Sequence, residues 1–177
     1  FASANGNVYW GDFKTSGAGT ATIGASSDIK GSLNVRGTGL VTINDAGNIS
    51  STVRGDVLMN AGSVTLGTAG LVVEGTFTMT AGTFSFGTRT LQLKGNFNRT
   101  GGTIDATAAG TGTLDFAGVT NQTFNPGTQM NVYKVTVNNA GNYLANVIDD
   151  NNVTIGASLI VLNDFTIADG RVVLGTS

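Results

Sequence analysis

The side chains that most often carry out chemistry in proteins are scarce in this chain. Histidine and cysteine are both absent, which removes the commonest general base, the thiolate nucleophile, disulfides and the strongest transition-metal ligands. Neither a Ser-His-Asp nor a Cys-His arrangement is possible. Glu74 is the single glutamate, and the aspartates are scattered. We therefore expect a protein that is not an enzyme and needs no cofactor.

One adjacent carboxylate pair, Asp149 and Asp150, stands in the segment NVIDDNNV. Carboxylate and amide oxygens are the ligands that calcium prefers, so the pair is a candidate for a weak calcium site. The recurring Gly-Gly-x-Gly-x-Asp signature of calcium-binding β-rolls is missing. The favoured interpretation is an Asp/Asn-rich turn with no metal.

Hydroxyl side chains recur at corresponding places of the sequence. These places are Thr20 and Thr22, Ser63 and Thr65, Thr83 and Ser85, and Thr103 and Asp105. A flat array of threonines is what ice-binding solenoids display, although threonine also suits the solvent face of any strand. Asp105 interrupts the array, and Arg171 and Val173 take these places in the last copy, so ice binding is only an alternative. Asn-x-Ser/Thr sequons occur at Asn48, Asn98, Asn121 and Asn152, where glycosylation of an exported protein is possible.

The elements that would position these side chains repeat every twenty residues. Gly55, Gly75 and Gly95 are twenty apart, as are Gly62, Gly82 and Gly102. The segment LIVLNDFTIADGRVVLG (159–175) aligns without a gap to LVVEGTFTMTAGTFSFG (71–87). Clear repeats cover 8–112 and 156–175, with looser coils over 113–155. A period of this length predicts a repeat architecture, here one domain over residues 1–177.

Within each unit apolar and polar residues alternate, which predicts half-buried strands of three to five residues. Glycine or asparagine stands between them, where the chain must turn. The expected inward ladder is Leu71, Val73, Phe77, Phe84, Phe86, Leu91, Leu93 and Phe97. Tyr9 falls on an inward position and Trp10 on an outward one.

Two all-β architectures fit short strands at this period. Antiparallel hairpins predict two-residue Asn-Gly or Asp-Gly turns, which are scarce apart from Asp169-Gly170. A parallel β-solenoid stacks each strand on its copy one coil away, which explains why Phe77 recurs as Phe97. We therefore predict a single parallel β-helix of about 20-residue coils, roughly eight in number.

The repeats resemble the Gly/Thr/Asn-rich β-helix repeats of bacterial surface and adhesin-like proteins, common in Bacteroidota. The likeness lies in Tyr133-Lys134-Val135-Thr136-Val137-Asn138-Asn139 and in Gly75-Thr76-Phe77-Thr78. The likeness extends over most of the chain and rests on motifs that are defined by their composition. It implies an extracellular or cell-surface structural protein, with no catalytic residues to transfer.

Composition narrows the classes of partner. The net charge is −2 and no basic cluster is present, which argues against nucleic acid. No run of about 18 apolar residues exists to cross a membrane as a helix. A glycan or another surface ligand remains possible, although one tryptophan and three tyrosines are few for a glycan groove.

The repeats reach close to both termini with no evident terminal cap, so open strand edges are expected at each end. The predicted assembly interface comprises Val8, Tyr9, Trp10, Arg171, Val172, Val173 and Leu174. Copies joined head to tail through such edges would form a filament or fibre. The alternatives are a stalk fragment of a larger adhesin and, further, an ice-binding or glycan-binding β-helix.

Overall fold

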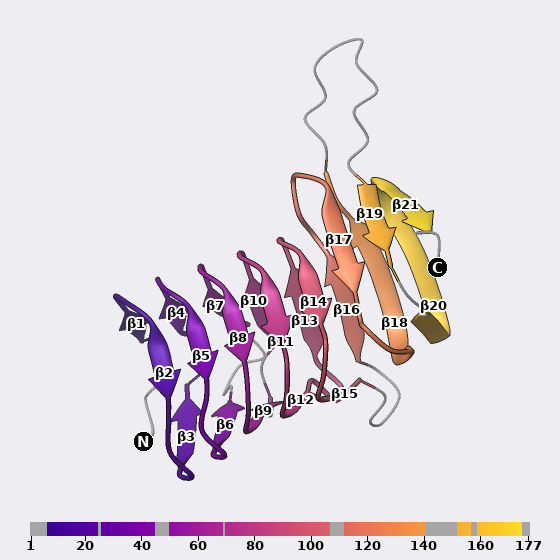
Figure 1. The fold of residues 1–177 in the computed structure, drawn as a ribbon. Helices are drawn as coiled ribbons and strands as arrows, with labels where there is room; N and C mark the ends of the chain where they lie inside the picture. Colours follow the sequence, from indigo (N-terminus) through magenta and orange to yellow (C-terminus); the bar gives the residue numbers. More distant parts are fainter. Residues whose placement is uncertain are drawn as a thin grey trace.

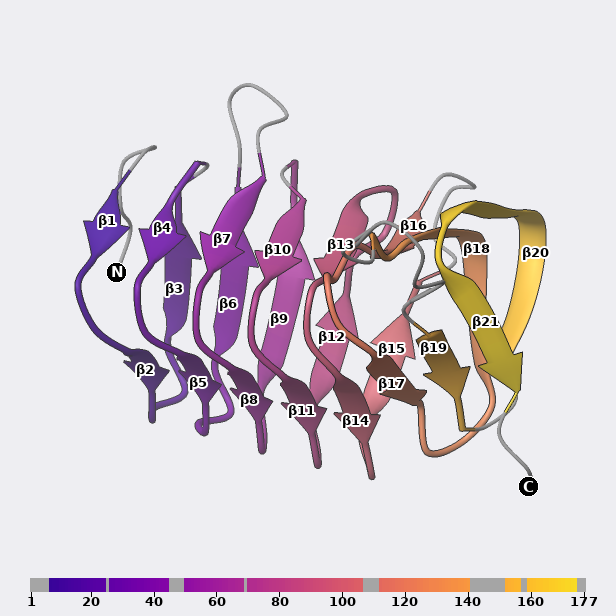
Figure 2. The ribbon, with the colours of Figure 1, turned by 90° about the horizontal axis from the view of Figure 1, so that it is seen from above.

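The computed structural model describes residues 7–24, 26–44, 50–68, 70–106, 112–140, 152–156 and 159–174. The regular secondary structure in this part of the chain consists of β-strands alone. The strands wind into a rod with the two termini at opposite ends (Figure 1). Seen from above, equivalent strands of successive coils lie side by side along the rod (Figure 2).

Three sheets form the walls of the rod, and each takes one strand from successive coils. The first long sheet contains β1 (Val8–Tyr9), β4 (Asp28–Ile29), β7 (Ser51–Val53), β10 (Leu71–Val73), β13 (Thr90–Leu93), β16 (Thr113–Phe116), β18 (Met130–Asn138) and β20 (Leu159–Asp169). The second long sheet contains β2 (Phe13–Thr15), β5 (Leu33–Val35), β8 (Val57–Met59), β11 (Phe77–Met79), β14 (Phe97–Arg99), β17 (Gln122–Asn125), β19 (Asn152–Ile155) and β21 (Arg171–Leu174). The short sheet contains β3 (Thr20–Ile23), β6 (Leu40–Ile43), β9 (Ser63–Leu66), β12 (Thr83–Ser85) and β15 (Thr103–Asp105).

All strand pairs among the described residues are parallel, so the predicted β-solenoid is confirmed and the hairpin alternative is wrong. The register repeats every twenty residues through the middle coils: Leu71 pairs with Leu91, and Phe77 with Phe97. Elsewhere the step lengthens, as from Phe97 to Phe124, because the extra residues are taken up between strands. About seven turns result.

Stacked apolar side chains fill the rod. Phe97 lies between Phe77 and Phe124, with ring centroids 5.0 and 4.8 Å away and nearly parallel planes. Phe84, from the short sheet, meets Phe77 edge-on at 5.0 Å. The eight residues of the expected inward ladder are all buried, with at most 1% of any side chain exposed. Aromatic stacking adds to the free energy gained by removing these rings from water.

Glycine at the corner before the short sheet is required by the backbone. Gly62, Gly82 and Gly102 occupy this corner in three successive coils with φ of +65°, +91° and +77°. A Cβ on Gly82 would overlap the carbonyl oxygen of Gly62 in the coil beneath. The twenty-residue spacing of glycine therefore reflects both a left-handed conformation and the close approach of stacked backbones.

The last copy does not fold as the repeat alignment predicts. The alignment equates Phe165 with Phe77 of the second long sheet, yet Phe165 pairs with Val135 in the first. Residues 159–169 form one eleven-residue strand, and β18 has nine residues, so the expected limit of five is wrong here. Asn163 replaces the corner Gly75, whose Cβ would meet the backbone of the previous coil. Without glycine the chain continues straight, with register shifts against β18.

Candidate functional site

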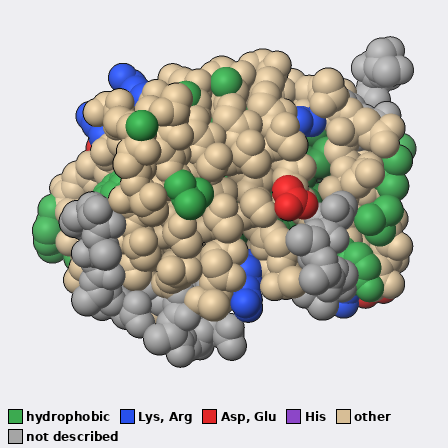
Figure 3. Space-filling view, turned by 90° about the horizontal axis from the view of Figure 1, so that it is seen from below, with side chains coloured by type: hydrophobic (Ala, Val, Ile, Leu, Met, Phe, Trp, Pro, Cys, Tyr) green, Lys and Arg blue, Asp and Glu red, His purple; other side chains and the backbone are tan. Residues whose placement is uncertain are grey.

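The C-terminal coil leaves core positions uncovered. Phe165 and Ile167 pair with the buried Val135 and Val137, so they lie on inward files of the first long sheet. Phe165 is 44% exposed, Ile167 51% and Leu174 77%. No strand among the described residues pairs with the outer edge of β20 or β21. Hydrophobic side chains gather at this end of the rod, on the right in Figure 3.

The N-terminal coil is the opposite open end and is better covered. Tyr9 and Phe13 are half-buried on inward files, paired with Ile29 and Leu33, and their rings meet edge-on at 5.5 Å. Trp10 is 84% exposed, with the ammonium of Lys30 5.8 Å from its ring centroid.

The structure places the predicted assembly residues at both extremities. Val8 and Tyr9 lie in β1 with Trp10 directly after it, and Arg171, Val172, Val173 and Leu174 make up β21. Arg171 Nε donates to Asn152 Oδ1 at 2.8 Å. Sequence reasoning missed the exposed apolar side chains of β20, which are Ile160, Leu162, Phe165 and Ile167. Their signal was the long apolar run LIVLNDFTIAD, which lacks a glycine.

The outer face of the short sheet carries two files of side chains in register. One file is Thr20, Leu40, Ser63, Thr83 and Thr103, and the other is Thr22, Thr42, Thr65, Ser85 and Asp105. Leu40 interrupts the first file, and Asp105 ends the second, where Ser85 Oγ donates to it at 3.3 Å. The repeat alignment places Arg171 and Val173 at the end of these two files. That expectation is wrong, because both residues lie in β21, which belongs to the second long sheet.

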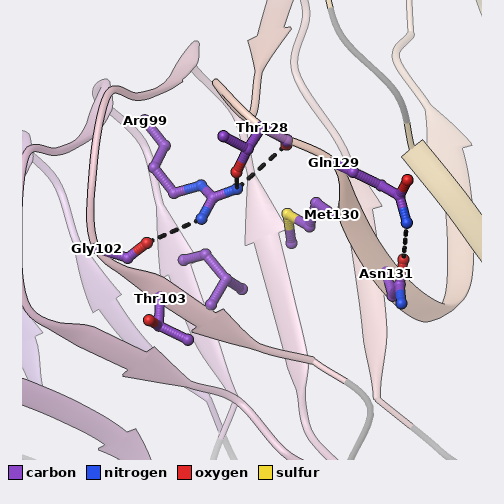
Figure 4. A pocket seen from close by; sticks show the side chains of 8 residues that line it. Arg99, Gly102, Thr103, Thr128, Gln129, Met130 and Asn131 are labelled. Atoms are coloured by element: carbon purple, nitrogen blue, oxygen red, sulfur yellow. Dashed lines mark hydrogen bonds between the residues drawn. The ribbon is translucent and has the colours of Figure 1, made fainter.

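A hollow of about 430 Å³ opens where the short sheet ends (Figure 4). Arg99, 7% exposed, reaches it from β14. Its guanidinium donates to the carbonyl oxygens of Pro126, Gly102 and Thr128 at 2.6, 2.9 and 3.2 Å, and to Thr128 Oγ1 at 2.8 Å. Burial lowers the pKa of Arg99. Sequence reasoning missed this site, because Arg99 stands at a position that the apolar–polar alternation assigns to the core.

The remaining candidate positions are the carboxylate pair and the four sequons. Asp149, Asp150 and Asn48 lie outside the described residues. Within the described part, no group of three or more acidic side chains could hold a metal ion. Asn98 and Asn121 are exposed and Asn152 is half-buried. No helix among the described residues is long and apolar enough to cross a membrane.

Comparison with known proteins identifies no relative of this chain. No protein-family model, no curated protein and no solved structure matches the chain. The open coils, the hydroxyl face and the buried arginine are therefore the features of the molecule that bear on its function.

Proposed function

We propose that the protein is a non-catalytic, extracellular structural protein, a β-solenoid unit that stacks end to end with further copies into a filament or surface fibre. One observation carries the proposal: inward apolar side chains of the C-terminal coil are exposed, beside strand edges that no described residue pairs. Burying such side chains is favourable, and unpaired strand edges are templates for adding another strand.

The first long sheet indicates what would cover this coil. One inward file runs Tyr9, Ile29, Val53, Val73, Leu93, Phe116, Val137 and Ile167. Extending the file by one strand places Tyr9 of a second copy on Ile167. The pairing would cover the half-exposed Ile167 with an aromatic ring that is itself only partly buried.

The second long sheet supports the same pairing. Its inward file runs Phe13, Leu33, Val57, Phe77, Phe97, Phe124, Ile155 and Leu174. The next strand would place Phe13 of a second copy on Leu174. Both files therefore join apolar to apolar in a head-to-tail contact, which does not close and so grows into a filament.

The contact would extend over the two long sheets only. Among the residues that the structure describes, the C-terminal coil contributes no strand to the short sheet, whose last strand is β15. β3 of the second copy would therefore begin a new short sheet. The joint between copies is narrower than the rod itself, which makes it the weakest place along the proposed filament.

Engineered cysteines test the head-to-tail register, because the natural chain has none to compete. Val8 and Thr166 are exposed ends of one outward file, so a double variant Val8→Cys/Thr166→Cys would pair across the joint. Neighbouring parallel strands lie about 4.8 Å apart, within reach of a disulfide. Oxidation should give a ladder of covalent oligomers on denaturing gels.

The controls separate the competing arrangements. The pair Thr136→Cys/Thr166→Cys, which is in register within one chain, should cross-link internally and stay monomeric. Dimers from Thr166→Cys alone would instead show tail-to-tail pairing. A double variant that stays monomeric at high concentration would refute self-stacking and favour the adhesin-stalk alternative, in which further coils of a longer polypeptide cover this end.

The hydroxyl face favours a second candidate function, ice binding. Serine or threonine fills eight of the ten places in the two outward files of the short sheet. Successive places are about 4.8 Å apart along the rod, so the hydroxyls form a regular flat array. Thermal hysteresis that disappears in a Thr65→Arg variant, with the fold intact, would support this function, and its absence in the natural chain would exclude it.

A further inference from the structure

Arg99 is a cation in a core position. It pairs in register with Met79, which pairs with Met59, and both methionines are fully buried. Arg99 as a whole residue is only 7% exposed, and none of the ion pairs among the described residues includes it. A buried charge without an opposite charge is costly, so this position calls for a specific reason.

The protein groups around Arg99 compensate the charge only in part. Three carbonyl oxygens and one hydroxyl accept from it, which occupies four of the five N–H groups of a guanidinium. These acceptors are neutral dipoles. The lowered pKa of Arg99, which results from burial, agrees with a charge that lacks an anion.

The hollow beside Arg99 has the lining of a small-molecule site. Its volume of about 430 Å³ suits a ligand of one or two rings. Figure 4 shows the guanidinium between Gly102 and Thr128, with Met130 to its right in the view. The remaining polar lining is Thr103, Gln129 and Asn131, where Gln129 Nε2 donates to Asn131 Oδ1 at 3.2 Å, and Ile104 supplies an apolar wall.

We propose that this hollow binds a carboxylate-bearing sugar, a uronate unit of an acidic polysaccharide. The carboxylate supplies the missing negative charge and accepts a charge-assisted hydrogen bond from the one guanidinium N–H that no protein group occupies. The ring hydroxyls exchange hydrogen bonds with the amides and hydroxyls of the rim, while Ile104 and Met130 contact the ring carbons. The site is independent of the proposed end-to-end stacking.

Binding is tested by adding galacturonate or glucuronate to the isotope-labelled chain and following amide and arginine signals by NMR. We expect concentration-dependent shifts confined to Arg99 and residues 102–104 and 128–131. The neutral sugars galactose and glucose should bind about tenfold more weakly or less, because they lack the charge. Equal affinity for neutral and acidic sugars, or shifts elsewhere only, would overturn the proposal.

The variants are placed at the rim of the hollow and not at Arg99, because Arg99 also holds the turn at 126–128 through its hydrogen bonds, and its loss could disturb the fold. Asn131→Ala and Thr103→Val should leave the fold unchanged and weaken uronate binding about threefold or more. Thr83→Val is the matched control, since Thr83 precedes Thr103 in the same outward file and does not line the hollow. Acetate binding as tightly as the uronates would show a bare anion site and refute the sugar assignment.

Discussion

Phe84 provides the sharpest test of the inward ladder. Its side chain is fully buried, pairs in register with Val64 and Ile104, and meets Phe77 edge-on at 5.0 Å. Replacing a buried phenylalanine with alanine costs about 3–5 kcal/mol through lost burial and the cavity left behind. The lost ring pair contributes about 0.5–1.5 kcal/mol within the same range of effects. We expect Phe84→Ala to lower the free energy of unfolding by about 4 kcal/mol.

The outward neighbour Thr83 is the matched control. It is exposed on the same strand, so Thr83→Ser should change the free energy of unfolding by less than about 0.5 kcal/mol. Urea unfolding followed by circular dichroism measures both. With a slope of about 2 kcal/mol per molar, Phe84→Ala should lower the urea midpoint by about 2 M. Phe84→Asp adds an unpaired buried charge and should prevent folding.

Two outcomes would refute the reasoning. One is a Phe84→Ala midpoint within about 0.5 M of the natural chain, which would mean that the ring is not in a packed core. The other is a Thr83→Ser variant as damaged as Phe84→Ala, which would reverse the assigned facing of β12.

Three further predictions concern a corner, a buried amide and a carboxylate. Gly82→Ala should destabilise the fold by about 1–3 kcal/mol or more, because φ is +91° and the methyl meets Gly62; Gly17→Ala, with open space around it, should be nearly neutral in the same urea assay. Gln122→Ala should cost about 1–3 kcal/mol in thermal or urea unfolding, because Gln122 Nε2 donates to the carbonyl oxygens of Leu93 and Gly95; equal stability of the natural chain and the variant would contradict that role. Hydrogen bonds, the stronger from Arg54 and the weaker from Lys30, hold the pKa of Asp28 below its ordinary value of 3.8. The ionised carboxylate therefore stabilises the fold above pH 3.8, and this stabilisation is lost as the pH falls through the lower pKa of the folded state. Asp28→Asn should therefore flatten the acid limb of stability against pH, and an unchanged limb would exclude the ion pair as its source.

The regular coils were predictable because their constraints are local and repeated. Alternation of apolar and polar residues set which side chains face inward, and glycine at a fixed spacing marked corners such as Gly82. Identical residues twenty apart, such as Phe77 and Phe97, then fixed the register, since a slip of one residue would turn every side chain to the other face.

The last coils and the Arg99 hollow could not be predicted in the same way. The repeat alignment gave Phe165 the place of Phe77, but the corner glycine is replaced by Asn163, and the strand runs on in the first long sheet. Arg99 follows Met59 and Met79 in one inward file, and three of its four hydrogen-bond acceptors come from a turn 27 to 29 residues later. Nothing in the local pattern links those segments.

The sequence by itself therefore determined the all-β solenoid, the twenty-residue length of its middle coils and the facing of most side chains, because these follow from alternation and glycine spacing along the chain. Only the tertiary structure decided where the short sheet stops, which apolar side chains remain exposed on β20, and that a buried guanidinium lies beside a polar hollow. Those features depend on which coil lies above another, and loops of variable length set that relation without leaving a periodic signal.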